Sequence, residues 1–449
     1  MARWITRWQP EDERFWSTTG RAIARRNLVF SIFAELLGFS VWLLWSVIVT
    51  RLNDAGFDLS SGQLFTLVAV PALVGATARF PYTFAVPRFG GRNWTVVSAL
   101  LLLVPTTLLV VLVDDPTTPY PVLLAAAATA GLGGGNFASS MANISFFFPD
   151  REKGWALGLN AAGGNIGVAV LQLVAPVAIT LGGSLELRNA GLMLMPFIVA
   201  AACCAWRWMD NLSTARSSFR DQVVVARNRH TWIVAWLYIG TFGSFIGYSA
   251  GLPLLMKQEF ADPNAIKYAF LGPLVGSLTR PLGGTLADRL GGARVTASNF
   301  SVMIAAVLGV VFALSDTGAA WSFPVFLAMF LVLFVTTGIG NGSTFRMVPV
   351  IFRAHHVGQD AGDGRAQPEA LVTARRESAA VLGITSAVGA YGGFFIPQGF
   401  GLSTSVTGGP TAALLVFVAF YGSCTALTWW CYLRRRVAAR VPNLAWARP

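Results

Sequence analysis

The sequence predicts an all-α membrane protein with twelve transmembrane helices in two related halves, and three observations support this prediction. Its 449 residues are 54% hydrophobic and only 12% charged, which is about half the charged share of a soluble globular domain. Nearly uncharged runs, each long enough to cross a hydrocarbon core of about 30 Å, recur along the chain. A motif in the second of these runs returns about 200 residues later.

The apolar runs define the expected helices in order. They are continuous and lack the alternation of β-barrel strands. They occupy more than half of the chain and leave no stretch long enough for a separate soluble domain, which argues against a membrane-anchored enzyme. We expect the spans at 28–50, 63–87, 95–113, 120–148, 154–181, 190–208, 231–256, 268–287, 294–315, 321–352, 371–400 and 410–433.

The positive charges indicate the topology of these spans. The formal net charge of +12 would suggest nucleic acid as a partner if the protein were soluble. Of the 33 Lys and Arg residues, however, 26 fall on the side of the N-terminus when those at the span ends on that side are counted with the adjoining loops, four fall on the opposite side, and Arg79, Arg280 and Arg346 lie further inside spans. By the positive-inside rule, both termini are expected in the cytoplasm. The charge therefore indicates a lipid bilayer as the partner, and no nucleic acid.

An internal duplication divides the spans into two sets of six. The motif Leu-Val-Gly, then Arg79, then Gly-Gly recurs with the same spacing around Arg280. An even number of spans in each half implies parallel repeats, an arrangement associated with alternating access to a central site. We expect an N-terminal half over 1–208, a cytoplasmic linker over 209–230 and a C-terminal half over 231–449.

Arg79 and Arg280 are the strongest candidates for function. An arginine in mid-span costs about 3 kcal/mol on insertion scales and persists only beside a cavity or a partner. By the duplication, the two should face each other across a central cavity. Structural ion pairs would need intramembrane carboxylates, and of 21 Asp and Glu residues only Glu35 lies well inside a span. We therefore favour binding of a small planar anion, whose oxygens match the paired N–H donors of a guanidinium.

Two glycine-rich runs, at 154–167 and 383–395, provide small residues that let helix backbones approach closely. Besides Gly154, their glycines are Gly158, Gly163, Gly164, Gly167, Gly383, Gly389, Gly392 and Gly393. The four cysteines fall in spans without the spacing of metal ligands, so neither a metal nor a cofactor is expected.

The same two runs resemble the paired nitrate signatures of the nitrate/nitrite porter family in the major facilitator superfamily. Segments 136–149 and 238–247 and the Trp-Gln-Pro-Glu-Asp of residues 8–12 extend the resemblance over essentially the whole chain. The resemblance implies the major facilitator fold and the transport of nitrate and nitrite. Segment 284–291 is similar to the loop motif of the superfamily, which implies that Asp288 and Arg289 act as a conformational latch.

The resemblance also implies a binding site. Its members would be Arg79 and Arg280 for the anion, Asn165 and Tyr238 as hydrogen-bonding partners, and Phe39, Phe137 and Phe242 as an aromatic wall. Tyr238 and Phe242 are four residues apart and therefore lie on one helix face. Flat apolar walls suit a flat, weakly hydrated anion better than a tetrahedral, strongly hydrated one.

Glu35 and Arg346 depart from this pattern. Glu35 lies one turn before Phe39 and could bind a coupling proton, pair with Arg346 or reach cytoplasmic water. Arg346 could instead extend towards the cytoplasmic side or lengthen the anion path.

Together these observations predict a nitrate/nitrite exchanger of the cytoplasmic (inner) membrane that works by alternating access as a monomer and is not an enzyme. A nitrate/proton symporter is the nearest alternative, because Glu35 could bind the coupling proton. An anion channel is a third reading, but the duplicated halves and closely packed glycine helices favour a carrier.

Overall fold

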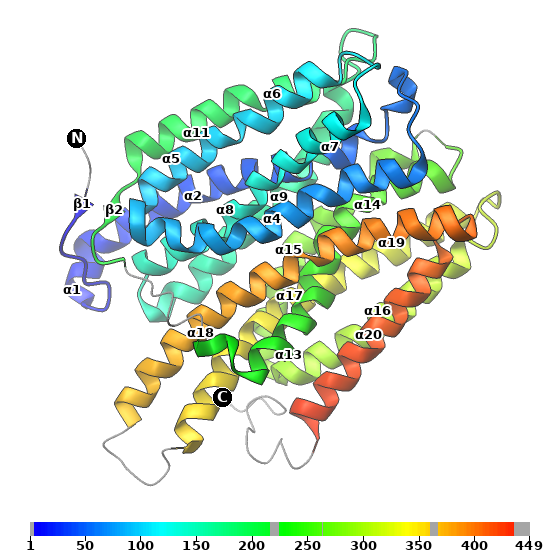
Figure 1. Ribbon diagram of the computed structural model, residues 1–449. Helices are drawn as coiled ribbons and strands as arrows, with labels where there is room; N and C mark the ends of the chain where they lie inside the picture. Colours follow the sequence, from blue (N-terminus) through cyan, green and yellow to red (C-terminus); the bar gives the residue numbers. More distant parts are fainter. Residues whose placement is uncertain (1–3, 216–223, 263, 360–366, 435–449) are drawn as a thin grey trace. The chain divides into compact units, whose positions relative to one another are not determined.

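The computed structural model describes residues 4–215, 224–262, 264–359 and 367–434 (Figure 1). These residues are almost entirely helical, and one short parallel strand pair joins β1 (Trp4–Ile5) to β2 (Asn211–Leu212). Residues 216–223 of the predicted linker and 435–449 of the basic C-terminal tail lie outside the described residues.

The chain packs as two compact units. The first contains the described residues up to 215 together with 247–277 and 393–409, and the second contains 224–246, 278–392 and 410–434. The first unit thus includes two segments of the predicted C-terminal half, 247–277 and 393–409, and the second unit lacks them. The predicted division into halves at 208 and 231 stays a prediction.

The helices follow the predicted runs. The first unit contains α1 (Glu13–Phe15), α2 (Arg21–Trp42), α3 (Trp45–Ile48), α4 (Ser61–Phe89), α5 (Gly91–Leu101), α6 (Leu103–Leu112), α7 (Tyr120–Thr129), α8 (Gly131–Phe147), α9 (Asp150–Ala178), α10 (Asn189–Leu192) and α11 (Met195–Trp208). The second contains α13 (Arg229–Tyr238), α16 (Gly292–Ala313), α17 (Ser322–Gln359), α18 (Gln367–Ala390) and α20 (Thr411–Thr428). Residues of α14 (Ser244–Glu259), α15 (Leu271–Leu290) and α19 (Gly392–Thr407) are divided between the units.

The predicted all-α membrane fold is confirmed. Among the described residues, eleven helical segments are long and apolar enough to cross a bilayer. The predicted eighth span is also a helix, α15, but its glycines, prolines and charged residues lower its hydropathy. The first span is longer than expected, because helix continues from Glu13 to Ile48.

Glycines at the repeated Gly-Gly motif end two equivalent helices. Gly90 terminates α4 with φ 87°, and Gly291 terminates α15 with φ 88°. Residues with a side chain rarely adopt this left-handed conformation. Both copies of the repeated motif therefore form a turn that requires glycine.

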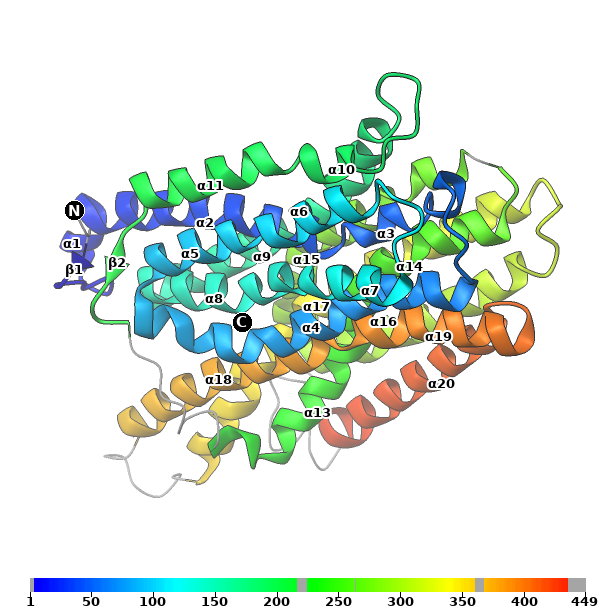
Figure 2. The same ribbon diagram turned by 45° about the horizontal axis from the view of Figure 1, so that its top comes forward.

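In the first unit, α2 packs against both α8 and α9, and α4 packs against α8 (Figure 1). On another flank, α11 runs beside α5 (Figure 2). This arrangement brings residues of α2, α4 and α8 together.

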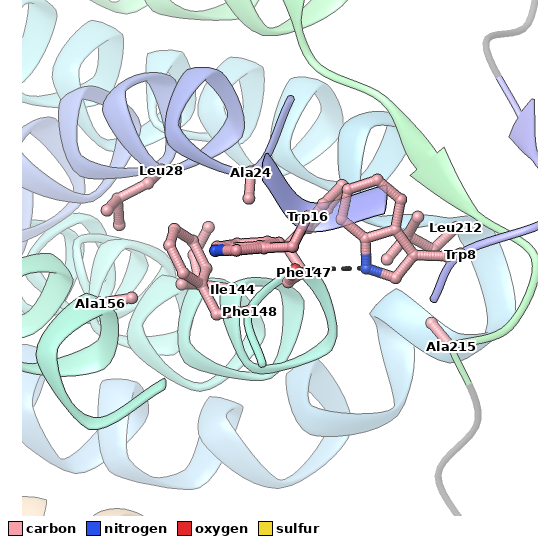
Figure 3. Packing of buried hydrophobic residues seen from close by; sticks show 10 residues of the cluster. All are labelled: Trp8, Trp16, Ala24, Leu28, Ile144, Phe147, Phe148, Ala156, Leu212 and Ala215. Carbon is pink, nitrogen blue, oxygen red and sulfur yellow. Dashed lines mark hydrogen bonds between the residues drawn. The ribbon is translucent and has the colours of Figure 1, made fainter. Parts of the chain in front are cut away.

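The N-terminal segment folds back onto the ends of α8 and α9 rather than remaining a separate tail. Figure 3 shows Trp8 and Trp16 in a cluster with Phe147, Phe148 and residues of β2 and the following turn. The Trp8 indole donates to the Phe147 carbonyl at 3.2 Å. The Trp16 indole donates to Glu152 Oε1 at 2.8 Å. The segment thus ties the start of the chain to the α8–α9 turn.

We expect Trp8→Ala to lower the free energy of unfolding by about 3 kcal/mol, because it removes a buried aromatic ring and its hydrogen bond. The thermal midpoint of the purified protein in detergent measures the effect. Trp4→Ala, in the same segment but at a half-exposed ring, should shift that midpoint much less. Equal shifts in the two variants would contradict the packing role of Trp8.

Candidate functional site

Arg79 of α4 is fully buried in the first unit. Its Nε donates to the carbonyl of Gly134 on α8 at 3.1 Å. Its guanidinium carbon lies 4.6 Å from the ring centre of Phe137 and 5.3 Å from that of Trp42. The positive charge is therefore held against aromatic faces, where a desolvated cation–π contact contributes about 2 kcal/mol.

Three rings complete this arrangement, which we call the Arg79 cluster (Arg79, Phe39, Trp42 and Phe137). Phe39 meets Trp42 edge-on at 5.4 Å and Phe137 at 6.0 Å. The Trp42 indole donates to the Pro71 carbonyl at 2.8 Å, which fixes the ring. Sequence reasoning missed Trp42, although it lies three residues after Phe39 on the same helix face.

The side-chain amide of Asn165 on α9 is buried and makes no hydrogen bond to the residues that the structure describes. Neither its oxygen nor its nitrogen has a hydrogen-bond partner among the residues that the structure describes. Buried amides in native proteins are almost always paired with protein, water or ligand. Asn165 can therefore donate to or accept from a bound solute.

The second unit holds a matching group, the Arg280 cluster (Arg280, Tyr238, Phe242 and Phe345). Arg280 Nη2 donates to the Tyr238 hydroxyl at 3.3 Å, and its guanidinium carbon lies 5.9 Å from the centre of the Phe345 ring. The Tyr238 and Phe242 rings stack at 5.4 Å with 17° between their planes, as their spacing predicts. Tyr238 also contacts Phe345 at 5.8 Å.

Phe242 lies within a π-helical turn over Ile239–Gly243, which begins directly after Tyr238. Such turns are frequent at functional sites. Sequence reasoning missed Phe345. The duplication pairs Phe137 with Thr344, so the signal pointed to the neighbouring position.

The first glycine run packs α9 directly onto α2. A Cβ on Gly163 would overlap Ile32, one on Gly164 would lie 2.7 Å from Glu35 Cγ, and one on Gly167 would overlap the Leu36 carbonyl. Gly158 is different, because a Cβ there would meet no atom of the described residues within 4 Å. The run is thus a docking surface for α2 over three of these four glycines.

The second run packs against the helix that carries Tyr238. A Cβ on Gly389 would overlap the Tyr238 ring, and one on Gly392 would press on the backbone of Gly243. The first run therefore supports α2, which carries Phe39 and Trp42 of the Arg79 cluster, and the second run supports the helix that carries Tyr238 of the Arg280 cluster.

Glu35 lies buried among polar side chains of three helices. It accepts hydrogen bonds from the Ser140 hydroxyl of α8 and, at 2.7 Å, from the Asn160 amide of α9. The predicted pairing of Glu35 with Arg346 stays a prediction. Within the second unit, Arg346 pairs with Asp288 at 2.6 Å, and both side chains are 53% exposed.

This ion pair explains how a charged Arg346 is tolerated inside a predicted span. The exposed guanidinium reaches the end of α15, where Asp288 holds it. Arg289 is also exposed. An exposed pair of this kind contributes at most about 1 kcal/mol to stability, and the predicted role of Asp288 and Arg289 as a conformational latch stays a prediction.

Comparisons with known proteins agree with this architecture. Residues 28–362 match the Major Facilitator Superfamily. The nitrate/nitrite transporter NarU of Escherichia coli (strain K12) is 43% identical over 455 residues, covering 98% of each chain. The probable nitrate/nitrite antiporter NarK2 of Thermus thermophilus is 38% identical, covering 96% of this chain and 97% of the relative.

Among solved structures, a bacterial homologue of the human lysosomal transporter Spinster has a TM-score of 0.63 at 13% identity, covering 94% of this chain and 98% of that one. Fold and sequence together define a multi-pass membrane carrier of the major facilitator type. Within that superfamily, the chain belongs to the nitrate/nitrite porter family.

Proposed function

We propose that the protein exchanges nitrate for nitrite across the cytoplasmic membrane by alternating access. The observation that carries the proposal is the repeated cluster: each unit holds a buried arginine against aromatic rings. The names of the relatives, nitrate/nitrite transporter and antiporter, support the same substrates.

The chemistry of the two clusters suits a planar, weakly hydrated anion. We propose that Arg79 and Arg280 both bind it through their paired N–H donors. Asn165 and Tyr238 donate further hydrogen bonds, and Phe39, Phe137 and Phe242 supply flat apolar walls. A strongly hydrated anion such as phosphate would lose too much hydration in these surroundings.

Two positively charged clusters also favour exchange over one-way transport. With no anion bound, two guanidinium groups brought to a common site repel each other. A bound anion offsets this repulsion and lets the carrier change its conformation. The empty carrier therefore changes conformation slowly. Uptake of an anion from one side of the membrane then requires a second anion to leave from the other side.

Contacts within the first unit support alternating access. Lys257 at the end of α14 bonds to Asp54 at 2.6 and 2.7 Å and to the Thr50 carbonyl at 2.6 Å. Thr66 of α4 donates to Gln398 of α19 at 3.3 Å. These contacts join residues from both predicted halves, on the side predicted to face away from the cytoplasm. We propose that they break when the carrier opens to that side.

The Asp54 ion pair persists at neutral pH. Partial burial alone would raise the pKa of Asp54, but the hydrogen bonds and charges of Lys257 and Arg51 outweigh it and lower the pKa below its usual value. The stabilisation from this carboxylate is present above its unfolded pKa and is lost only as the pH falls through the lowered one. Mild acidification therefore leaves the ion pair between Asp54 and Lys257 intact.

Counterflow in proteoliposomes tests the proposed exchange. With nitrite inside and labelled nitrate outside, at equal pH on both sides, we expect rapid uptake of label. With no anion inside, uptake should fall about tenfold or more. Equal uptake in the two conditions would rule out obligatory exchange.

A nitrate/proton symport is the second candidate, and the burial of Glu35 favours it. The Ser140 hydroxyl can donate to a carboxylate or accept from a carboxylic acid, and it also lies 2.8 Å from the Ser31 hydroxyl. The Asn160 amide contacts both Glu35 and Ser140 at 2.7 Å. This network can hold the side chain with or without a proton, one turn from Phe39 of the Arg79 cluster.

Glu35→Gln separates the two candidates. For a symporter, a tenfold proton gradient with the membrane potential clamped at zero should drive about tenfold nitrate accumulation, and the variant should lose it while keeping counterflow. For a pure exchanger, neither protein accumulates nitrate. Glu186→Gln, in an exposed loop, serves as the control.

The cellular setting belongs to the same proposal. We propose a monomeric carrier in the bacterial inner membrane with both termini in the cytoplasm. The carrier acts on its substrates without chemical change and is therefore not an enzyme.

A further inference from the structure

Asn341 of α17 is a second buried amide without hydrogen bonds. Its side chain is about 1% exposed, and neither amide atom has a partner among the residues that the structure describes. The hydroxyls of Thr344, on the same turn, and Thr385 of α18 are equally buried and also lack partners there. Unpaired polar groups of this kind are costly, so each of these side chains in the second unit is suited to contact with a polar ligand.

The neighbours of Asn341 along α17 fix its direction. A Cβ on Gly342 would overlap the Arg280 carbonyl, so that face of α17 touches α15. A Cβ on Gly340 would lie 2.5 Å from the Thr241 side chain, so the opposite face touches the π-helical turn. With 100° between successive residues, Asn341 points between these two contacts.

Phe345 gives the same direction independently. It lies one turn after Asn341 and therefore shares its face. Its ring contacts both the Arg280 guanidinium and the Tyr238 ring. Asn341 thus points towards the Arg280 cluster, with its donor uncommitted.

We propose that the Asn341 Nδ2 donates a hydrogen bond to an oxygen of the transported planar oxyanion beside Arg280. This inference rests on the proposed function and adds a specificity-determining residue to it. An amide donor with a fixed direction complements the guanidinium, because nitrate and nitrite offer only acceptors. Asn341 would then play in the second unit the part that Asn165 plays in the first.

Nitrate titration of the purified full-length protein in detergent, followed by calorimetry, tests the assignment. Loss of a hydrogen bond to a charged ligand should weaken nitrate binding at least about tenfold in Asn341→Ala. Asn341→Asp keeps the size of the side chain but replaces the donor by a group that repels the anion, so it should bind still more weakly. The matched control is Asn299→Ala, a buried amide of α16 that already contacts Met303 sulfur at 3.6 Å; it should change affinity less than about twofold.

The outcomes are distinct. Nitrate binding within twofold of the wild type in Asn341→Ala, or a loss no larger than in Asn299→Ala, overturns the inference and leaves the proposed function standing. A milder defect in Asn341→Asp than in Asn341→Ala identifies a packing role, or a buried water only, and also overturns it. Absence of nitrate binding in the wild type overturns the proposed function itself.

Discussion

Arg79→Lys and Arg280→Lys should each reduce nitrate/nitrite counterflow at least about a hundredfold. Lysine keeps the charge but replaces a planar fork of donors by a single compact ammonium. It loses the paired hydrogen bonds to the anion, each of which contributes about 1.5–3 kcal/mol. It also weakens the stacking on Phe137 or Phe345 that orients the guanidinium. Initial rates of labelled nitrate uptake into liposomes loaded with nitrite measure the effect.

Arg92→Lys is a closely matched control for these variants. Arg92 of α5 is also buried, donates its Nε to the Trp206 carbonyl at 2.8 Å and lies over the Trp206 ring, but it belongs to neither cluster. Its replacement should leave counterflow within about twofold of the wild type. If all three lysine variants lose transport equally, the loss reflects general packing of buried arginines, and the assignment of the two clusters fails.

The repeated elements of the fold could be predicted because they depend on local sequence. Span length follows from the bilayer thickness, and the turn at Gly90 and Gly291 follows from a conformation that glycine adopts. The duplication added Arg280 as the equivalent of Arg79. Both arginines lie beside aromatic rings, in one unit each.

Long-range contacts of the site could not be predicted in the same way. Trp42 contacts Arg79 only because α2, α4 and α8 converge, and a tryptophan in an apolar run is otherwise indistinguishable from a lipid-facing one. Trp8 packs against Phe147, 139 residues away. From the sequence alone, Arg346 could pair with Glu35, extend towards the cytoplasmic side or lengthen the anion path, because its distance from Asp288 depends on how α15 and α17 pack.

Gly167→Ala should reduce the amount of folded protein sharply, with a loss of about 3 kcal/mol in the free energy of unfolding. The added Cβ would overlap the backbone carbonyl of Leu36, which cannot rotate away as a side chain can. α9 must then move away from α2. The hydrogen bond from the Ser40 hydroxyl to the Gly167 carbonyl, at 2.9 Å, would be strained by the same movement. Thermal unfolding in detergent and counterflow of the remaining folded fraction measure the two effects.

Gly158→Ala is the control in the same helix and the same glycine run. Its Cβ would enter open space among the described residues, and alanine favours a helix by about 1 kcal/mol over glycine. This variant should therefore be as stable as the wild type or slightly more stable, with unchanged counterflow. If Gly158→Ala abolishes transport while Gly167→Ala is tolerated, the run serves the anion directly and the docking of α9 on α2 is not its main role. We expect the opposite result, in which Gly167→Ala is damaging and Gly158→Ala is tolerated. Because the two substitutions are chemically identical, this difference follows from the backbone contact at Gly167 alone.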